Sequence, residues 1–107
     1  MGCKAECSFT RSYPATVNEA ESTEMAARAA RAVVGEARTR PLPQPTMGGE
    51  DFSFMLNEKP GAYLFLGGGR GPEEAMVHHP LYDFNDEILP VGASWFATLA
   101  EQLMPRR

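Results

Sequence analysis

The chain has 107 residues, 43% of them hydrophobic and 22% charged, a balance typical of one globular domain rather than a disordered segment. Its formal charge of −4 argues against nucleic acid as a partner. No apolar run approaches the ~20 residues that a membrane span needs, and the first seven residues lack the apolar stretch of a secretory signal. We therefore expect a soluble, cytoplasmic protein with no membrane partner.

Residues 3–13 alternate small or apolar side chains with polar ones, which is the period of a half-buried strand. Cys3 and Cys7 would share one face of this strand with their Cα atoms ~13 Å apart, which is too far for a disulfide. We expect two free thiols. A disulfide would need a turn here, and a metal site would need further ligands.

The clearest helix is predicted over residues 19–34. Asn18 is placed to cap its first turn, with Glu21 reaching back toward the cap, and Gly35 is placed to end it. Methionine, alanine and valine recur at four-residue steps along one face, so the buried face carries mostly small side chains. A neighbouring element is therefore expected to approach this helix closely.

Further elements are expected after a proline-rich connector at residues 36–48. The apolar-rich segment 52–56 predicts one or two helical turns. Residues 62–66 form a continuous apolar run bounded by glycines, which indicates a strand buried on both faces. A last helix is expected over residues 87–104, capped by Asp86. These elements predict the α/β fold class, with two main helices plus a few strands.

The densest set of potential ligands follows the apolar run. His78 and His79 stand before Pro80, with two aspartates and an asparagine close behind. Neutral imidazole is a common metal ligand, and nearby carboxylates can orient it by accepting its other N–H. Adjacent histidines can chelate one metal only with a strained backbone, so at most one of them is expected to be a ligand. The alternative is a solvated turn.

A second candidate group is Gly48, Gly49, Glu50 and Asp51, at the start of the short helical segment. The glycine N–H groups could hold an anion or an acyl oxygen. The two acids weaken that attraction and favour helix capping or supporting hydrogen bonds instead. The glycine-rich run at 67–71 lacks the Lys-Ser/Thr end of a phosphate-binding loop, so phosphate is not expected there.

Several motifs, read together, resemble the C-terminal end of metal-dependent amidohydrolases. They are residues 47–53 (Met-Gly-Gly-Glu-Asp-Phe-Ser), 60–67 (Pro-Gly-Ala-Tyr-Leu-Phe-Leu-Gly) and 78–92 (His-His-Pro-Leu-Tyr-Asp-Phe-Asn-Asp-Glu-Ile-Leu-Pro-Val-Gly). The group is that of hippurate hydrolase, N-acyl-amino-acid amidohydrolase and the auxin-conjugate hydrolases, within the aminoacylase–carboxypeptidase metallopeptidase family. Residues 13–18 also resemble the point where that family's chain leaves its lid domain.

The resemblance implies part of the catalytic domain of a two-domain, metallopeptidase-like amidohydrolase. Residues 1–17 would be the last strand of the lid (dimerisation) domain and its return, and residues 18–107 the C-terminal part of the metal-binding catalytic domain. The parent enzyme would cleave the amide bond of a small N-acyl amino acid with two divalent metals, among which zinc, manganese, cobalt and nickel are not distinguished. A homo-oligomer is expected.

The resemblance also assigns roles to single residues. His78, with Pro80 two positions on, occupies the family's last metal-ligand position. Positions expected beside the ligands or near the substrate are Gly48, Gly49, Glu50, Asp51, His79 and Asn18. The family's other ligands and its general base find no match, so no catalytic residue is expected here. The fragment alone should be inactive and hold no metal tightly. The alternative is a non-enzymatic truncated module that self-associates or binds a protein partner.

Overall fold

Helix α1 spans Ala20–Val34 in the computed structural model, which describes residues 2–104. Its cap is Glu19, whose carboxylate accepts hydrogen bonds from the backbone N–H groups of Glu21 (2.9 Å) and Ser22 (2.7 Å). The prediction of Asn18 as the cap is wrong, because both polar atoms of the Asn18 amide bond the backbone of Tyr63. Gly35 ends the helix as predicted, at φ 82°, a conformation that glycine adopts without strain.

Helix α3, Leu89–Leu103, follows a single 3₁₀ turn, η2, at Asp86–Ile88. The predicted cap is again shifted by one residue. Asn85, not Asp86, accepts the N–H of Glu87 (3.1 Å), because Asp86 is already the first residue of the turn. Among residues 2–104, no helix has the length and apolar character needed to cross a membrane.

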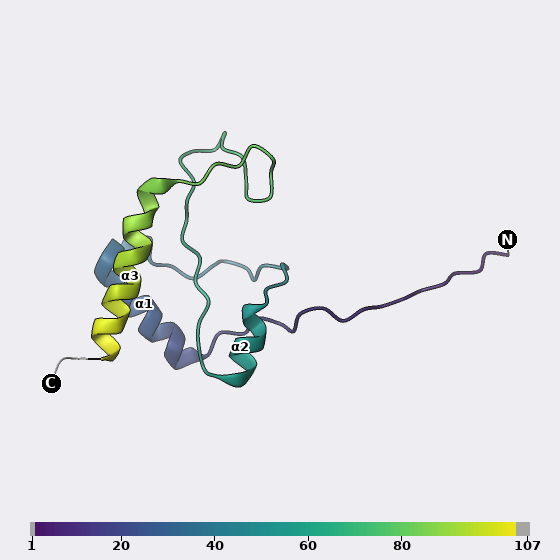
Figure 1. Cartoon of the computed structure of the whole chain (residues 1–107), viewed down its shortest axis with the longest axis horizontal. Coiled ribbons are helices and arrows are strands. Elements are labelled where there is room, and N and C mark those ends of the chain that lie inside the picture. Colours follow the sequence, from purple (N-terminus) through teal and green to yellow (C-terminus); the bar gives the residue numbers. More distant parts are fainter. Residues whose placement is uncertain (1, 105–107) are drawn as a thin grey trace.

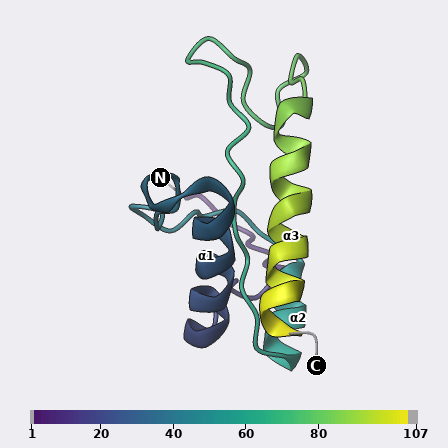
Figure 2. The same cartoon turned by 90° about the vertical axis from the view of Figure 1, so that its left-hand side faces the viewer.

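Helices α1 and α3 pack side by side and form the centre of the structure (Figures 1 and 2). The predicted small-residue face is confirmed, since Ala26 and Ala29 are buried and Ala29 is 0% exposed. Their small side chains let Trp95 of α3 come close enough for its indole Nε1–H to donate to the Ala26 carbonyl oxygen (3.0 Å). A second bond, from Arg28 Nε to Gln102 Oε1 (3.0 Å), ties the same two helices together.

The connector between α1 and the next helix is irregular apart from one 3₁₀ turn, η1, at Glu36–Arg38. Helix α2, Phe52–Glu58, then forms where one or two helical turns were predicted. Its Ser53 is buried, and the hydroxyl donates to the Glu50 carbonyl oxygen (2.6 Å). This bond fixes the start of α2 against the Gly48–Asp51 segment.

No strand forms within residues 2–104, so the expected α/β class is not confirmed and the described chain is helical. The part of residues 3–13 that precedes Tyr13 extends away from the helices (Figure 1), and Phe9 is 84% exposed. Residues 62–66 are also extended, but half-buried or exposed rather than buried on both faces. The physical reason is common to both: a strand forms only when a neighbour accepts and donates its backbone hydrogen bonds.

The described chain buries little. Its radius of gyration is 18.5 Å, against about 13 Å expected for a compact domain of this length. Ala26, Ala29 and Ser53 are the buried residues in the part that the structure describes, whereas many large apolar side chains are exposed. Packing therefore stabilises the α1–α3 pair and leaves most other apolar surface uncovered.

The Glu19 cap predicts a pH dependence of helix stability. Hydrogen bonds from the first-turn backbone lower the pKa of Glu19 below its ordinary value of 4.5. A carboxyl whose pKa is lower in the folded state stabilises that state above its unfolded pKa, and this contribution is lost as pH falls through the folded value. We expect the thermal midpoint of the chain to fall on acidification below about pH 4.5, and to fall less in a Glu19→Gln variant. Circular dichroism melts would measure both, and equal pH dependence of the two chains would contradict the cap.

Candidate functional site

The His78–His79 pair lies in an exposed turn between the extended segment and η2. Backbone hydrogen bonds define this turn, from His79 N–H to the Met76 carbonyl (3.0 Å) and from Tyr82 N–H to the His79 carbonyl (2.9 Å). The His79 ring also takes part, since its Nδ1 accepts the N–H of Leu81 (3.1 Å). One nitrogen of His79 is therefore occupied in shaping the turn.

The backbone conformation of His78 differs from that of the other non-glycine residues within 2–104. Its φ is 71°, in the left-handed region, and it is the one non-glycine residue described there with a positive φ. That region is uncommon for side chains other than asparagine, aspartate and histidine, and non-glycine residues held in it cluster at functional sites. The exposed imidazole of His78 is thus presented from a constrained backbone.

The Gly48–Asp51 segment lies at the start of α2 and is linked to Tyr63. The nearby Tyr63 hydroxyl is the largest cause that lowers the pKa of the Glu50 carboxyl, and the Glu50 carboxylate in turn raises the pKa of Tyr63. Glu50 Oε1 also accepts the N–H of Phe52 (3.3 Å). Both shifts favour an ionised Glu50 carboxylate next to a protonated Tyr63 hydroxyl.

Asn18 joins the same group through the backbone of Tyr63. Its Nδ2 donates to the Tyr63 carbonyl (2.9 Å), and its Oδ1 accepts the Tyr63 N–H (2.8 Å). One residue further on, Glu19 N–H donates to the Gly61 carbonyl (2.9 Å). Asn18 and Glu50, two of the positions expected near the substrate, thus both lie against Tyr63, a residue of the run predicted to be a buried strand.

Gly49 packs against the residues that precede α1. A Cβ built on Gly49 would lie 2.9 Å from a ring carbon of Tyr13, so the approach requires a glycine. The Tyr13 ring in turn meets Phe54 of α2 edge-on, with centroids 6.0 Å apart. The chain around Tyr13, where the N-terminal extension ends, therefore packs against the start of α2.

The two candidate groups are not brought together in this chain. The segment that holds His78 lies beyond the N-terminal end of α3, whereas α2 lies toward the C-terminal end of α3 (Figures 1 and 2). Among residues 2–104, no three His, Cys, Asp or Glu side chains are grouped so that they could hold a metal ion, and Cys3 and Cys7 are exposed free thiols. The donors described within residues 2–104 therefore do not fit a complete metal centre.

Comparisons with known proteins give a family for the chain. A family profile described as "Peptidase family M20/M25/M40" matches residues 3–102. A probable hydrolase of Synechocystis sp. is 31% identical over 93 residues, covering 85% of this chain and 24% of the relative. The hippurate hydrolase of Campylobacter jejuni is 34% identical over 87 residues, covering 81% of this chain and 22% of the relative.

A plant relative matches a shorter stretch. The IAA-amino acid hydrolase ILR1-like 4 of Arabidopsis thaliana is 40% identical over 63 residues, covering 57% of this chain and 14% of the relative. No solved structure matches the chain significantly. The chain spans about a quarter or less of the length of these three curated relatives. The family profile covers nearly all of the chain, and the relatives named here are hydrolases, as the resemblance implies. The chain belongs to peptidase family M20/M25/M40.

Proposed function

We propose that the chain supplies the C-terminal part of the catalytic domain of a dinuclear-metal amidohydrolase that cleaves small N-acyl amino acids. The names of two relatives, hippurate hydrolase and IAA-amino acid hydrolase, support this substrate class. Residues 1–17 would belong to the lid domain and its return. The chain would work in the cytoplasm, and the divalent metal would be zinc, manganese, cobalt or nickel.

His78 carries this proposal, as the ligand that this segment contributes to the metal centre. Its exposed imidazole projects from a left-handed backbone (φ 71°), a conformation over-represented at functional sites, and it stands at the position that the resemblance gives to a metal ligand. The metals, when bound, would polarise the substrate carbonyl and supply the nucleophile. The remaining ligands and the general base must come from polypeptide other than residues 2–104, because the described donors form no metal cluster.

The cluster of Asn18, Glu50 and Tyr63 has a supporting role in this proposal. It fixes the entry to α1 and the start of α2 on the same extended segment that leads to the His78 turn. Gly48, Gly49 and Asp51 lie next to it, away from the His78 turn, and would support the start of α2. His79 would orient the turn through its bond with Leu81.

A hybrid enzyme tests the proposal. In this hybrid, the matching segment of the Campylobacter jejuni hippurate hydrolase is replaced by the present chain. We expect the hybrid to bind metal and to release glycine from hippurate. The 107-residue chain alone should show no turnover with added manganese, zinc or cobalt, because one imidazole cannot assemble the site. Metal-dependent turnover by the chain alone, above a His78→Ala control, would overturn this role.

A non-enzymatic module that self-associates or binds a protein partner is the second candidate. The uncovered apolar surface favours it, including an open hollow lined by Phe52, Met55, Leu56 and Pro60. Exposed apolar patches of this kind mark interaction surfaces. A hybrid that folds but neither binds metal nor hydrolyses hippurate would favour the module.

A further inference from the structure

We propose that Arg70 is a positioning residue that closes the loop of residues 70–84 and thereby fixes the place of His78. The inference deepens the proposed function, because it rests on His78 being the metal ligand of this segment. The contacts that carry it are a set of bonds across the mouth of the loop, which we name the Arg70 clasp: Arg70, Glu74, Asp83 and the Phe84 carbonyl.

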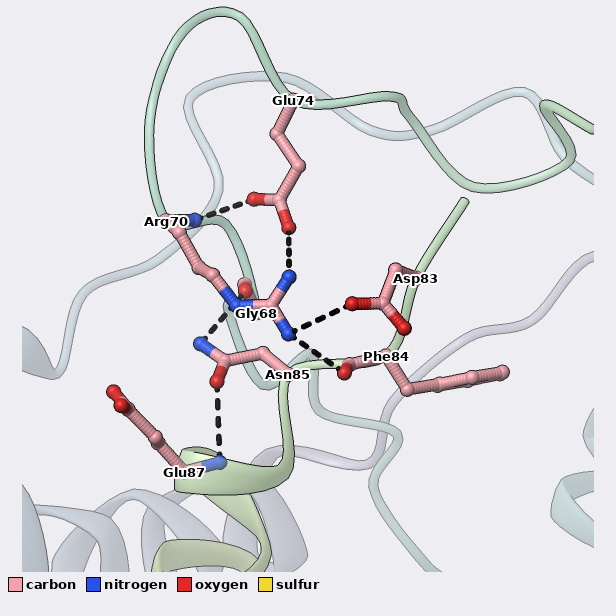
Figure 3. Close-up of polar contacts among 7 residues, drawn as sticks. All are labelled: Gly68, Arg70, Glu74, Asp83, Phe84, Asn85 and Glu87. Carbon is pink, nitrogen blue, oxygen red and sulfur yellow. Dashed lines mark hydrogen bonds and ion pairs between the residues drawn. The ribbon is translucent and has the colours of Figure 1, made fainter. Parts of the chain in front are cut away.

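The guanidinium of Arg70 joins the two ends of the loop (Figure 3). Its Nη1 donates to Glu74 Oε1 (2.8 Å), four residues on. Its Nη2 donates to the Phe84 carbonyl oxygen (2.8 Å) and lies 3.3 Å from Asp83 Oδ2. The backbone N–H of Arg70 also donates to Glu74, so both the main chain and the side chain of Arg70 are held. One side chain thus spans fourteen positions of sequence.

A second tie anchors the closed loop to helix α3. Asn85 Nδ2 donates to the Gly68 carbonyl oxygen (3.1 Å), and Asn85 Oδ1 caps η2 through the Glu87 N–H (Figure 3). Gly68 lies so close to η2 that an added Cβ would be 3.3 Å from Ile88 Cδ1. The two ends of the loop are therefore fixed relative to the start of α3, and the Arg70 clasp holds the adjoining loop residues in place as well.

His78 lies inside the loop that the clasp closes. Its left-handed backbone persists only where the surroundings impose it, and the clasp and the two backbone bonds of the turn are the contacts that do so. A metal ligand must be held within about 0.5 Å of its productive position, and residues that lock its backbone supply that accuracy. Loops of this size whose ends are held together are frequently functional.

Arginine suits this position better than lysine would. The planar guanidinium presents several donors in fixed directions, so it can contact Glu74 on one side and Phe84 on the other at once. The partners are not equivalent. The Glu74 side chain is only 20% exposed, whereas that of Asp83 is 81% exposed and its ion pair is screened by water. Glu74 should therefore matter more than Asp83.

The test measures the backbone of His78 in the 107-residue chain by NMR, without metal. The ¹³Cα and ¹³Cβ shifts of His78 report its left-handed conformation, and amide exchange of His79 and Tyr82 reports the turn. In Arg70→Gln we expect the His78 shifts to move toward unfolded values and the two amides to exchange at least about tenfold faster. We expect smaller changes in Arg70→Lys than in Arg70→Gln, because lysine keeps the charge. Glu74→Gln should change the His78 shifts and the two exchange rates more than Asp83→Asn does.

A matched control is available on helix α1. Arg31 forms ion pairs with Glu24 and Glu36, so Arg31→Gln removes an arginine of similar surroundings far from the loop. We expect it to leave the His78 signals unchanged, and Arg70→Gln to leave the amides of α1 unchanged. Unchanged His78 signals in Arg70→Gln would overturn the inference, as would intrinsic exchange rates for His79 and Tyr82 in the unsubstituted chain. Because no metal is used, this result is independent of whether His78 is a ligand, which His78→Ala tests in the hybrid.

Discussion

Replacing His78 with alanine in the hybrid enzyme is expected to lower metal content and hippurate hydrolysis by at least ~10–100-fold, since losses even of groups that only orient a ligand reach that range. The exposed imidazole of His78 stands at the position that the family resemblance gives to a metal ligand. Metal content by mass spectrometry and the rate of glycine release would be measured on the same preparation.

His79 provides the matched control for this prediction. Its Nδ1 accepts the Leu81 N–H, so it has a role in the turn that does not require a metal. We expect His79→Ala to cost much less in both measurements. If the two substitutions are equally harmful, or if His79→Ala is the worse, the ligand assignment within the pair is wrong.

A third variant separates the imidazole from the backbone strain. His78→Gly removes the ring but accepts a φ of 71° without cost, whereas alanine is disfavoured there. We expect His78→Gly to lose as much metal as His78→Ala. Retention of metal by the glycine variant would show that the backbone conformation, not the imidazole, is what the site requires.

Enlarging Ala29 to leucine is expected to destabilise the helix pair by about 1–3 kcal/mol, the usual effect of overpacking a close contact. Ala29 is 0% exposed on the face of α1 that also carries Ala26, whose carbonyl bonds Trp95 of α3. A leucine there must displace its neighbours or adopt an unfavourable rotamer. Because the described chain buries so few residues, a loss of this size is large relative to its stability. Urea unfolding followed by circular dichroism would measure it.

The control for Ala29→Leu is the same substitution three residues later. Ala32 lies on the exposed face of α1, where leucine changes helix propensity but meets no neighbour. We expect Ala32→Leu to change the free energy of unfolding by less than about 0.5 kcal/mol. Equal destabilisation by the two leucines would mean that α1 and α3 do not pack in solution as described.

The helices could be predicted because their signals are local. The small-residue face of α1 and the glycine at its end act within a few residues of the chain, and both predictions are confirmed. The cap of α1 could not be predicted to the residue, because a distant residue competes with the helix for the Asn18 side chain. Asn18 bonds the backbone of Tyr63, forty-five positions later, instead of the first turn of α1. Glu19, which is left beside the free N–H groups, takes its place.

The strand predictions failed for a different reason. Alternation along residues 3–13 and the apolar run at 62–66 report which faces a strand would bury, but they do not supply the neighbouring strand. Within residues 2–104 no strand forms, and the backbone bonds that reach the segment 61–63 come from Asn18 and Glu19, which lie beyond the alternating stretch. A period-two pattern therefore predicts compatibility with a sheet rather than its formation.

The candidate site was only partly readable from the sequence. His78, Glu50 and Asn18 were singled out by residue type and motif. Tyr63 was missed because it lies in a run of apolar residues, where its hydroxyl gives no periodic signal. Arg70 was missed because its partners are spread over fourteen positions, and only the closed loop brings them to one guanidinium.

The single tryptophan of the chain gives the α1–α3 contact a built-in optical reporter. The Trp95 indole bonds the Ala26 carbonyl across the helix pair, so its emission wavelength depends on whether these two helices are in contact. The Arg70 clasp, the His78 turn and α2 contain no tryptophan and would not contribute to tryptophan emission, which is excited apart from that of tyrosine at long wavelength. Trp95 fluorescence should therefore report when α1 and α3 lose contact, and backbone circular dichroism should report when each helix unwinds. Both can be followed in one unlabelled sample.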